Sequence, residues 1–320
     1  MPLKKLVIVT PALAQANNGN WQTAQRWARM LGRNYRVRLS ERWVQGDEDL
    51  MIALHARRSA ASVAAWRQHS SRPLVLVLTG TDLYRDIDCD ASAQQSLHDA
   101  DRLVVLNELG VERLPLALRP KALVCLQSCP PRQPQRKTGR HLRALMVGHL
   151  REEKSPQTYF EAARLLAGRS DILLDHIGDG LDPALAEQAR ALMQEQPRER
   201  SRYRWLGGLP HATTRARIAA AHVLVHASRM EGGAHVVIEA LTSATPVLTS
   251  RIDGNLGLLG RDYPGVFDWG DASALAALLQ QARDTETMLP TLRALCDARA
   301  ALFAPERERQ TLLTLLSGLA

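Results

Sequence analysis

Two glutamates, Glu231 and Glu239, stand eight positions apart and enclose a stretch rich in glycine. The stretch begins with Gly232, Gly233, Ala234 and His235. If a helix starts here, its first N–H groups are uncovered and, with the helix dipole, hold a negatively charged oxygen. The two carboxylates then accept hydrogen bonds from hydroxyls at two points of one ligand. Taken alone, the pattern fits equally well a helix with a surface glutamate behind a flexible loop.

A second group of residues combines glycine with two cations. Gly148 ends an apolar run and lets the backbone approach a ligand, and Arg151 and Lys154 follow before a predicted helix at Ser155-Pro156. Two cations beside a helix N-terminus suit a diphosphate. Considered by itself, the segment fits a solvated charged turn better. Both groups follow predicted strands of the same half of the chain, so we expect them at the same sheet edge.

Strands and helices alternate in the first half. Apolar or alternating runs predict strands at residues 6–10, 35–39, 49–54, 74–78 and 103–106. Residues 15–20 read as a loop, and apolar residues at helical spacing predict a helix over 21–31. This alternation is typical of a doubly wound α/β domain.

The second half repeats the pattern. Strands are predicted at residues 142–147, 172–177, 203–207, 222–227, 246–249 and 266–267. Helices are predicted after Ser155 as N-cap, from about Ala234, over 272–281 and over 305–320, with a tight turn at 253–255. The stretch 128–139 is rich in proline and reads as a linker.

The chain is therefore expected to be α/β, with two Rossmann-like domains facing a cleft. We place a first domain at 1–138, a second domain at 139–304, and a final helix at 305–320 that crosses back to the first domain. Parallel sheets bind ligands at the carboxyl ends of their strands. A hinged cleft between two such edges suits a reaction between two substrates.

Composition narrows the class of protein. The 320 residues are 45% hydrophobic, 23% charged and 4% aromatic, which is globular and poor in groups that stack on bases. Nucleic-acid binding is therefore not expected. The sequence shows no membrane span, no signal peptide and no paired cysteine motif, which predicts a cytoplasmic protein without stable membrane association.

The net charge of +8 is unevenly distributed. Residues 1–138 hold 20 Lys and Arg against 12 Asp and Glu, whereas residues 139–320 hold 21 of each. A basic first half favours a small anionic substrate by electrostatic focusing. A general richness in arginine explains the same count equally well.

The order and spacing of these residues between 142 and 257 resemble the C-terminal half of family-four glycosyltransferases of the GT-B fold. The matching positions are Val147-Gly148 with Arg151 and Lys154, Ile177 to Gly180, Trp205 to Gly207, Ala227 to Arg229, Glu231 to Leu241, Pro246 to Thr249, and Asp253-Gly254. The glutamate pair with its fixed gap is the most specific of them.

The resemblance implies roles for these residues. Arg151 and Lys154 look like the pair that binds the diphosphate, Glu239 like the glutamate that holds the ribose hydroxyls, and Glu231 like the one that contacts the donor sugar. The backbone of 232–235 would hold the sugar and phosphates, and the segment at Leu206 would meet the base. Such enzymes generally need no metal or other cofactor, because cations and helix dipoles take up the leaving-group charge.

The first half is similar to a small bacterial subgroup whose known activity is selenosugar synthesis in selenoneine formation. The similarity rests on residues 10–23 and 79–84. It implies a UDP-linked N-acetylglucosamine or glucose as donor and selenophosphate as acceptor. Gly19 and Asn20 would close over the donor phosphates, and Thr81 and Asp82 would line the acceptor side of the cleft.

The chain also departs from the family. Ala234 replaces a phenylalanine-like residue, and His235 stands where a small or polar residue is usual. Two alternatives stay open: a glycosyltransferase acting on another small or lipid hydroxyl acceptor, and a non-catalytic protein that binds a nucleotide sugar.

Overall fold

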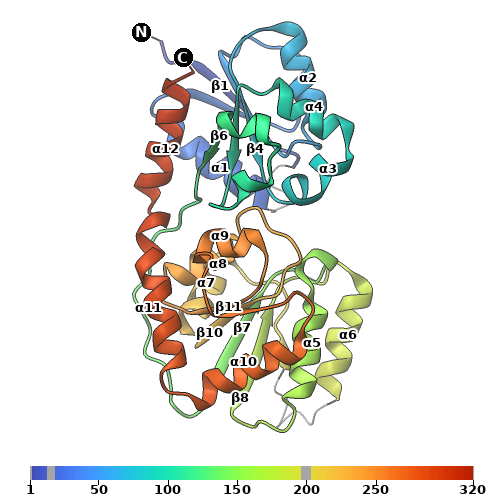
Figure 1. Ribbon diagram of the computed structural model, residues 1–320, viewed down its shortest axis with the longest axis vertical. Helices are drawn as coiled ribbons and strands as arrows, with labels where there is room; N and C mark the ends of the chain where they lie inside the picture. The colour runs from blue at the N-terminus through green and yellow to red at the C-terminus, as the bar shows by residue number, and fades with distance from the viewer. Residues whose placement is uncertain (1, 13–18, 196–202, 320) are drawn as a thin grey trace. The chain divides into compact units, whose positions relative to one another are not determined.

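The computed structural model describes residues 2–12, 19–195 and 203–319. The chain divides into two compact units. Unit 1 comprises Met1–Ser128, Glu231–His235 and Ala304–Ala320, and unit 2 comprises Cys129–Met230 and Val236–Phe303. Each unit is built on one six-stranded parallel sheet, as can be followed in Figure 1.

The sheet of unit 1 has the strand order β2-β1-β3-β4-β5-β6. Its strands are β1 (Lys5–Val9), β2 (Arg36–Ser40), β3 (Leu50–Leu54), β4 (Leu74–Leu78), β5 (Arg102–Val105) and β6 (Ala122–Val124). Five of these were predicted within two residues of their observed bounds. The strand β6 was missed because it has three half-buried residues at the sheet edge and no long apolar run.

Alternate side chains of β1 enter the cores on the two faces of this sheet. Val7 and Val9 belong to the core cluster that contains Trp66, whereas Leu6 and Ile8 belong to the cluster that contains Trp27. The helices of the unit are α1 (Gly19–Leu31), α2 (Ala60–His69), α3 (Ile87–Cys89), α4 (Ala91–Asp99) and α12 (Pro305–Ser317), with a π-helical turn at Asp82–Asp86 and 3₁₀ turns at Gly110–Arg113 and Leu116–Lys121. Leucines of α12 share the second cluster with α1.

The sheet of unit 2 has the order β12-β11-β10-β7-β8-β9. Its strands are β7 (Leu142–Val147), β8 (Ile172–Ile177), β9 (Tyr203–Trp205), β10 (Val223–His226), β11 (Val247–Ser250) and β12 (Val266–Phe267). Its helices are α5 (Pro156–Leu165), α6 (Pro183–Gln194), α7 (His211–Ala220), α8 (His235–Leu241), α9 (Asp253–Leu259), α10 (Ala272–Asp284) and α11 (Met288–Ala300), with 3₁₀ turns at Glu152–Lys154 and Ala301–Phe303. All six predicted strands of this half are present, so the two-sheet α/β prediction is confirmed.

Two local predictions were wrong. Residues 253–255 do not make a tight turn but begin α9, because the buried Leu258 and Leu259 supply a helical apolar face. Ser155 precedes α5 but does not cap it with its side chain: its backbone is left-handed, with φ of 47°. Its hydroxyl instead donates to Glu152 O over 3.3 Å.

Gly19 and Asn20 were placed in a loop, but they form the first turn of α1. Residues 15–18, the rest of that predicted loop, lie outside the described residues. Within the described residues, no helix is long and apolar enough to cross a membrane.

Candidate active site

In the sheet of unit 2, the direction in which successive strands are added reverses between the neighbouring parallel strands β7 and β10. From β7 the chain builds outward through β8 and β9, and it then returns to add β10 on the other side. The loops that follow β7 and β10 therefore diverge at the carboxyl edge, where parallel α/β sheets leave a crevice for a ligand. The first of these loops carries Gly148 to Lys154, and the part of the second that belongs to unit 2 ends at Met230.

The backbone at the end of β7 is held by a buried histidine. Burial lowers the pKa of His176 to about 4, so the ring is neutral. Its Nε2 donates to Gly148 O over 3.1 Å, and its Nδ1 accepts from the Tyr203 hydroxyl at 3.0 Å. Gly178 passes so close that a Cβ there would meet Gly148 O at 1.9 Å. The two strand ends are thus packed backbone to backbone, with no side chain between them.

The predicted diphosphate pair follows directly. Arg151 is exposed, with its Nε 3.9 Å from a carboxylate oxygen of Glu153. The stem of Lys154 lies along Gly148, with its Cγ and Cδ 3.4 Å from where a Cβ would be. Arg151 directly precedes the 3₁₀ turn and Lys154 is its last residue, shortly before α5 begins. The arrangement allows both to meet an anion at this edge, and their role stays a prediction.

A set of contacts ties the β7 loop to the loops after β10 and β12. Trp269 Nε1 donates to Ser155 Oγ over 2.8 Å, and the Arg229 guanidinium lies 5.0 Å from the centre of the Trp269 ring. Arg229 N donates to Glu153 O over 2.9 Å. These contacts fix the turn that carries Lys154. No local pattern predicts these contacts, because they join segments far apart in the chain.

Glu239 lies on the second turn of α8 and is 4% exposed. Its Oε1 is 2.6 Å from Nε2 of His211, the first residue of α7. This hydrogen bond raises the pKa of His211. Leu206, predicted to meet the base, is half-buried beyond the end of β9, where its N–H donates to His176 O over 2.8 Å. Sequence reasoning missed His211, whose only signal is its place after Pro210 at a helix start.

The glycine-rich loop itself belongs to unit 1, whereas Glu239 belongs to unit 2. Asn107 Nδ2 donates to Gly232 O over 2.7 Å, and a Cβ on Gly232 would lie 2.3 Å from the Thr79 carbonyl. Gly233 lies beside Leu106 in the same way. The structure therefore brings the segment that begins at Glu231 together with the loop after β4.

The other end of that segment is also held within unit 1. Ala234 is buried, and His235 Nε2 lies 3.2 Å from Ser128 O. Because a carbonyl only accepts, the His235 ring donates here through Nε2. His235 thus has a backbone contact that positions the loop, and its contact with a donor stays a prediction.

Thr81 follows β4 and is paired with a strained histidine. His55, directly after β3, has a left-handed backbone with φ of 73° and is 2% exposed. Arg58 N donates to its Nδ1 over 3.3 Å, so the proton is on Nε2, which donates to Thr81 Oγ1 over 3.0 Å. Burial lowers the pKa of His55 and keeps it neutral. The Thr81 hydroxyl accepts this hydrogen bond, so its own proton is directed away from His55. Left-handed backbone at a residue other than glycine, as at His55, is found most often at functional sites.

Asp82 does not line an open surface. It is fully buried, and its Oδ1 accepts from Thr79 N at 2.9 Å and Gly80 N at 2.8 Å, while its Oδ2 accepts from Ala56 N at 2.9 Å. Its carboxylate is used to shape the loops after β3 and β4. The expectation that Asp82 faces the acceptor is corrected accordingly, whereas half-buried Thr81 keeps its candidate role.

Gly19 and Asn20 provide the N-terminal turn of α1. Thr23 Oγ1 donates to Gly19 O over 2.9 Å, and nothing lies within 4 Å of where a Gly19 Cβ would be. Neither space nor backbone angle therefore requires glycine here. Their contact with donor phosphates stays a prediction. No cluster of three metal-binding side chains occurs among the described residues.

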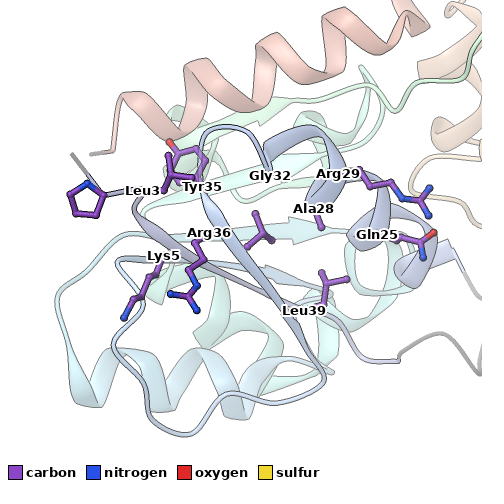
Figure 2. Close-up of a pocket in the computed structure, with 11 residues that line it drawn as sticks. Leu3, Lys5, Gln25, Ala28, Arg29, Gly32, Tyr35, Arg36 and Leu39 are labelled. Carbon is purple, nitrogen blue, oxygen red and sulfur yellow. The ribbon is translucent and has the colours of Figure 1, made fainter.

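A pocket of about 760 Å³ opens elsewhere in unit 1, between α1 and the edge strand β2 (Figure 2). Lys5 and Arg36, which line it, are the first residues of β1 and β2, and Gly32 follows the end of α1. Most of the pocket therefore lies toward the amino ends of the strands. Ligands of parallel sheets bind at the opposite edge, so we do not assign the reaction to this pocket.

Comparison with known proteins agrees with the fold. The model of the family described as Glycosyl transferases group 1 matches residues 131–295, just over half of the chain. A search of curated proteins finds no match. Sucrose-phosphate synthase from Thermosynechococcus elongatus is 18% identical, with a TM-score of 0.77 over 99% of both chains.

Two further structures are similar. HepE of Anabaena, solved in complex with UDP, is 15% identical, with a TM-score of 0.74 over 98% of this chain and 100% of HepE. TarM of S. aureus is 14% identical, with a TM-score of 0.66. The match includes 83% of this chain and 55% of TarM, so the chain spans about half the length of TarM. At these identities the likeness is one of fold, and it confirms the GT-B prediction.

Proposed function

The chain belongs to the glycosyl transferases of group 1, and on that premise we propose that it transfers a sugar from a UDP-sugar to selenophosphate. The observation that carries the donor half is the placement of two loops at one switch point: the β7 loop with Arg151 and Lys154, and the β10 loop that leads to Glu239. HepE in complex with UDP supports a uridine nucleotide as the donor's leaving group.

Net charge does not distinguish the two units: unit 1 holds 19 Lys and Arg against 15 Asp and Glu, and unit 2 holds 22 against 18, so each carries +4. Two features of unit 1 support a small anionic acceptor. The loop that begins at Glu231 lies against Thr79 in this unit, and the hydroxyl of Thr81 accepts from neutral His55. A hydroxyl whose acceptor side is already occupied has its proton available for an anionic oxygen.

The proposed reaction is a substitution at the anomeric carbon of the donor sugar. Selenium of selenophosphate forms a bond to that carbon, and the carbon–oxygen bond to UDP breaks, with the electron pair leaving on the diphosphate. Arg151 and Lys154 stabilise this developing charge, so no metal is needed. Selenophosphate enters as an anion, and no strong base is required to deprotonate it.

The test is product analysis with purified protein. UDP-N-acetylglucosamine and UDP-glucose are each incubated with selenophosphate, phosphate or a set of sugar alcohols, with and without a chelator. We expect a product mass containing selenium and one transferred sugar, N-acetylglucosamine or glucose according to the donor, formed equally with the chelator present. Transfer only to hydroxyl acceptors would refute the selenophosphate assignment. Binding of UDP without turnover on any acceptor would favour a non-catalytic protein.

A further inference from the structure

His211 and Glu239 form an ion pair in which one side chain is exposed and the other is buried. The Nε2 and Oε1 atoms are 2.6 Å apart, and the His211 side chain is 73% exposed, whereas that of Glu239 is 6% exposed. Both residues belong to unit 2, His211 at the start of α7 and Glu239 on α8. A solvent-exposed ring thus meets one oxygen of a carboxylate that is otherwise covered by protein.

The charge on His211 matters for this carboxylate. Removing a carboxylate from water favours its neutral form, and a nearby cation favours the ionised form. Arg215, one turn further along α7, and Arg132, ahead of β7, oppose the protonation of His211, but the hydrogen bond to Glu239 outweighs them and raises the pKa of His211 above 6.5. The imidazolium therefore places a positive charge next to the Glu239 carboxylate.

The contact with His211 involves one of the two oxygens of the Glu239 carboxylate. An ionised carboxylate accepts about four hydrogen bonds, and His211 takes one of them on Oε1. A fixed donor on one oxygen restricts the rotation of the carboxylate, so the remaining acceptor sites keep one direction. Vicinal hydroxyls need two acceptor sites in a fixed arrangement.

We propose that His211 is a positioning residue for the donor, holding the Glu239 carboxylate in the orientation that accepts the ribose hydroxyls of a uridine nucleotide. This inference rests on the proposed function and on the ribose-binding role that the family resemblance implies for Glu239. The proposal adds to Arg151 and Lys154 a further residue that acts on the donor, and it gives donor binding a pH dependence.

The sign of that dependence follows from the raised pKa. Below pH 6.5 the ring is charged in both the folded and unfolded protein, and the ion pair contributes fully. As the pH rises through the higher folded value, the ring loses its proton and the charge that supports Glu239 is lost. We therefore expect UDP affinity to fall as the pH rises through a window that begins above 6.5.

The experiment measures dissociation constants of UDP and 2′-deoxy-UDP by calorimetry from pH 6 to 9. The variants are His211→Gln, a neutral donor; His211→Arg, a permanent cation; and His98→Gln, a control at an exposed histidine of α4 in unit 1. At pH 6 we expect His211→Gln to weaken UDP binding about fivefold, the upper range for an ion pair with one exposed partner. Binding of 2′-deoxy-UDP should change little, because it lacks a hydroxyl that Glu239 would hold.

His211→Arg should retain most of the wild-type affinity and lose the pH dependence, and the control should match wild type. Equal weakening of UDP and 2′-deoxy-UDP, or no weakening of either, would overturn the proposal while leaving the proposed function standing. Failure of wild-type protein to bind UDP would instead overturn the proposed donor, and this inference with it. Thermal unfolding of each variant verifies that the exposed substitutions leave the fold intact.

Discussion

Replacing Gly232 with alanine tests whether the glycine-rich loop must lie against the loop after β4. A Cβ at this position would meet the carbonyl carbon and oxygen of Thr79 at 2.3 Å and Gly80 N at 2.6 Å. All three are backbone atoms and cannot rotate away. Ordinary carbon contacts are about 3.5 to 4.0 Å, so one backbone has to move by more than about 1 Å.

Such a displacement is costly for a reaction that depends on alignment. A misplacement of about 1 Å can lower turnover about 100-fold, even when it arises outside the reacting groups. The shift would also strain the hydrogen bond from Asn107 to Gly232 O, at present 2.7 Å. We therefore expect Gly232→Ala to lower kcat/KM about 100-fold, measured by UDP release in the presence of acceptor.

Gly168→Ala is the matched control, because nothing lies within 4 Å of its added methyl group. It should keep wild-type kcat/KM. Melting temperatures of both variants separate lost alignment from lost folding. A Gly232→Ala enzyme with wild-type kcat/KM would refute the reasoning, since it would mean that the loop functions without this close approach.

Four further substitutions test other parts of the protein. Arg151→Ala and Lys154→Ala should each lower kcat/KM at least about tenfold, because each removes a cation that meets the leaving diphosphate. Arg164→Ala, which removes an exposed arginine of α5, is the control and should keep wild-type kcat/KM. Wild-type turnover in the Arg151 or the Lys154 variant would contradict the assignment. Thr81→Val should lower kcat/KM for the acceptor about tenfold, as expected for one lost hydrogen bond, without changing UDP affinity measured by calorimetry; an unchanged kcat/KM would exclude a role for the hydroxyl. Glu308→Ala removes a buried carboxylate and should lower the free energy of unfolding by about 3 kcal/mol in urea titrations; a loss below about 1 kcal/mol would show that its contacts are replaced by solvent.

The magnitude for Glu308 follows from its partners. It accepts from Trp27 Nε1 at 2.6 Å, from Arg26 Nε at 3.0 Å and from Ser128 N at 2.8 Å. Breaking a buried pair costs about 3 to 5 kcal/mol, and we use the lower end because Arg26 keeps 19% of its side chain exposed to water.

Local pattern was enough to predict most strands and the two loops at the edge of the second sheet. Buried parallel strands are short, apolar and rich in β-branched residues, so β1 and β7 are visible in the sequence without knowledge of their neighbours. The loops with Gly148 and Gly232 follow such strands, and this order along the chain is a local property. Short elements were harder: β6 has too few residues to show a pattern, and the glycine at the start of α9 suggested a turn.

The tertiary structure alone decided which distant residues meet. Strand order sets the switch point between β7 and β10, and nothing in either strand encodes its neighbour. Asn107 reaches Gly232 across 125 positions, and His211 reaches Glu239 across 28 positions. Periodicity reports which face of an element is buried, whereas these contacts depend on how whole elements pack against each other, and that information is spread over the entire core.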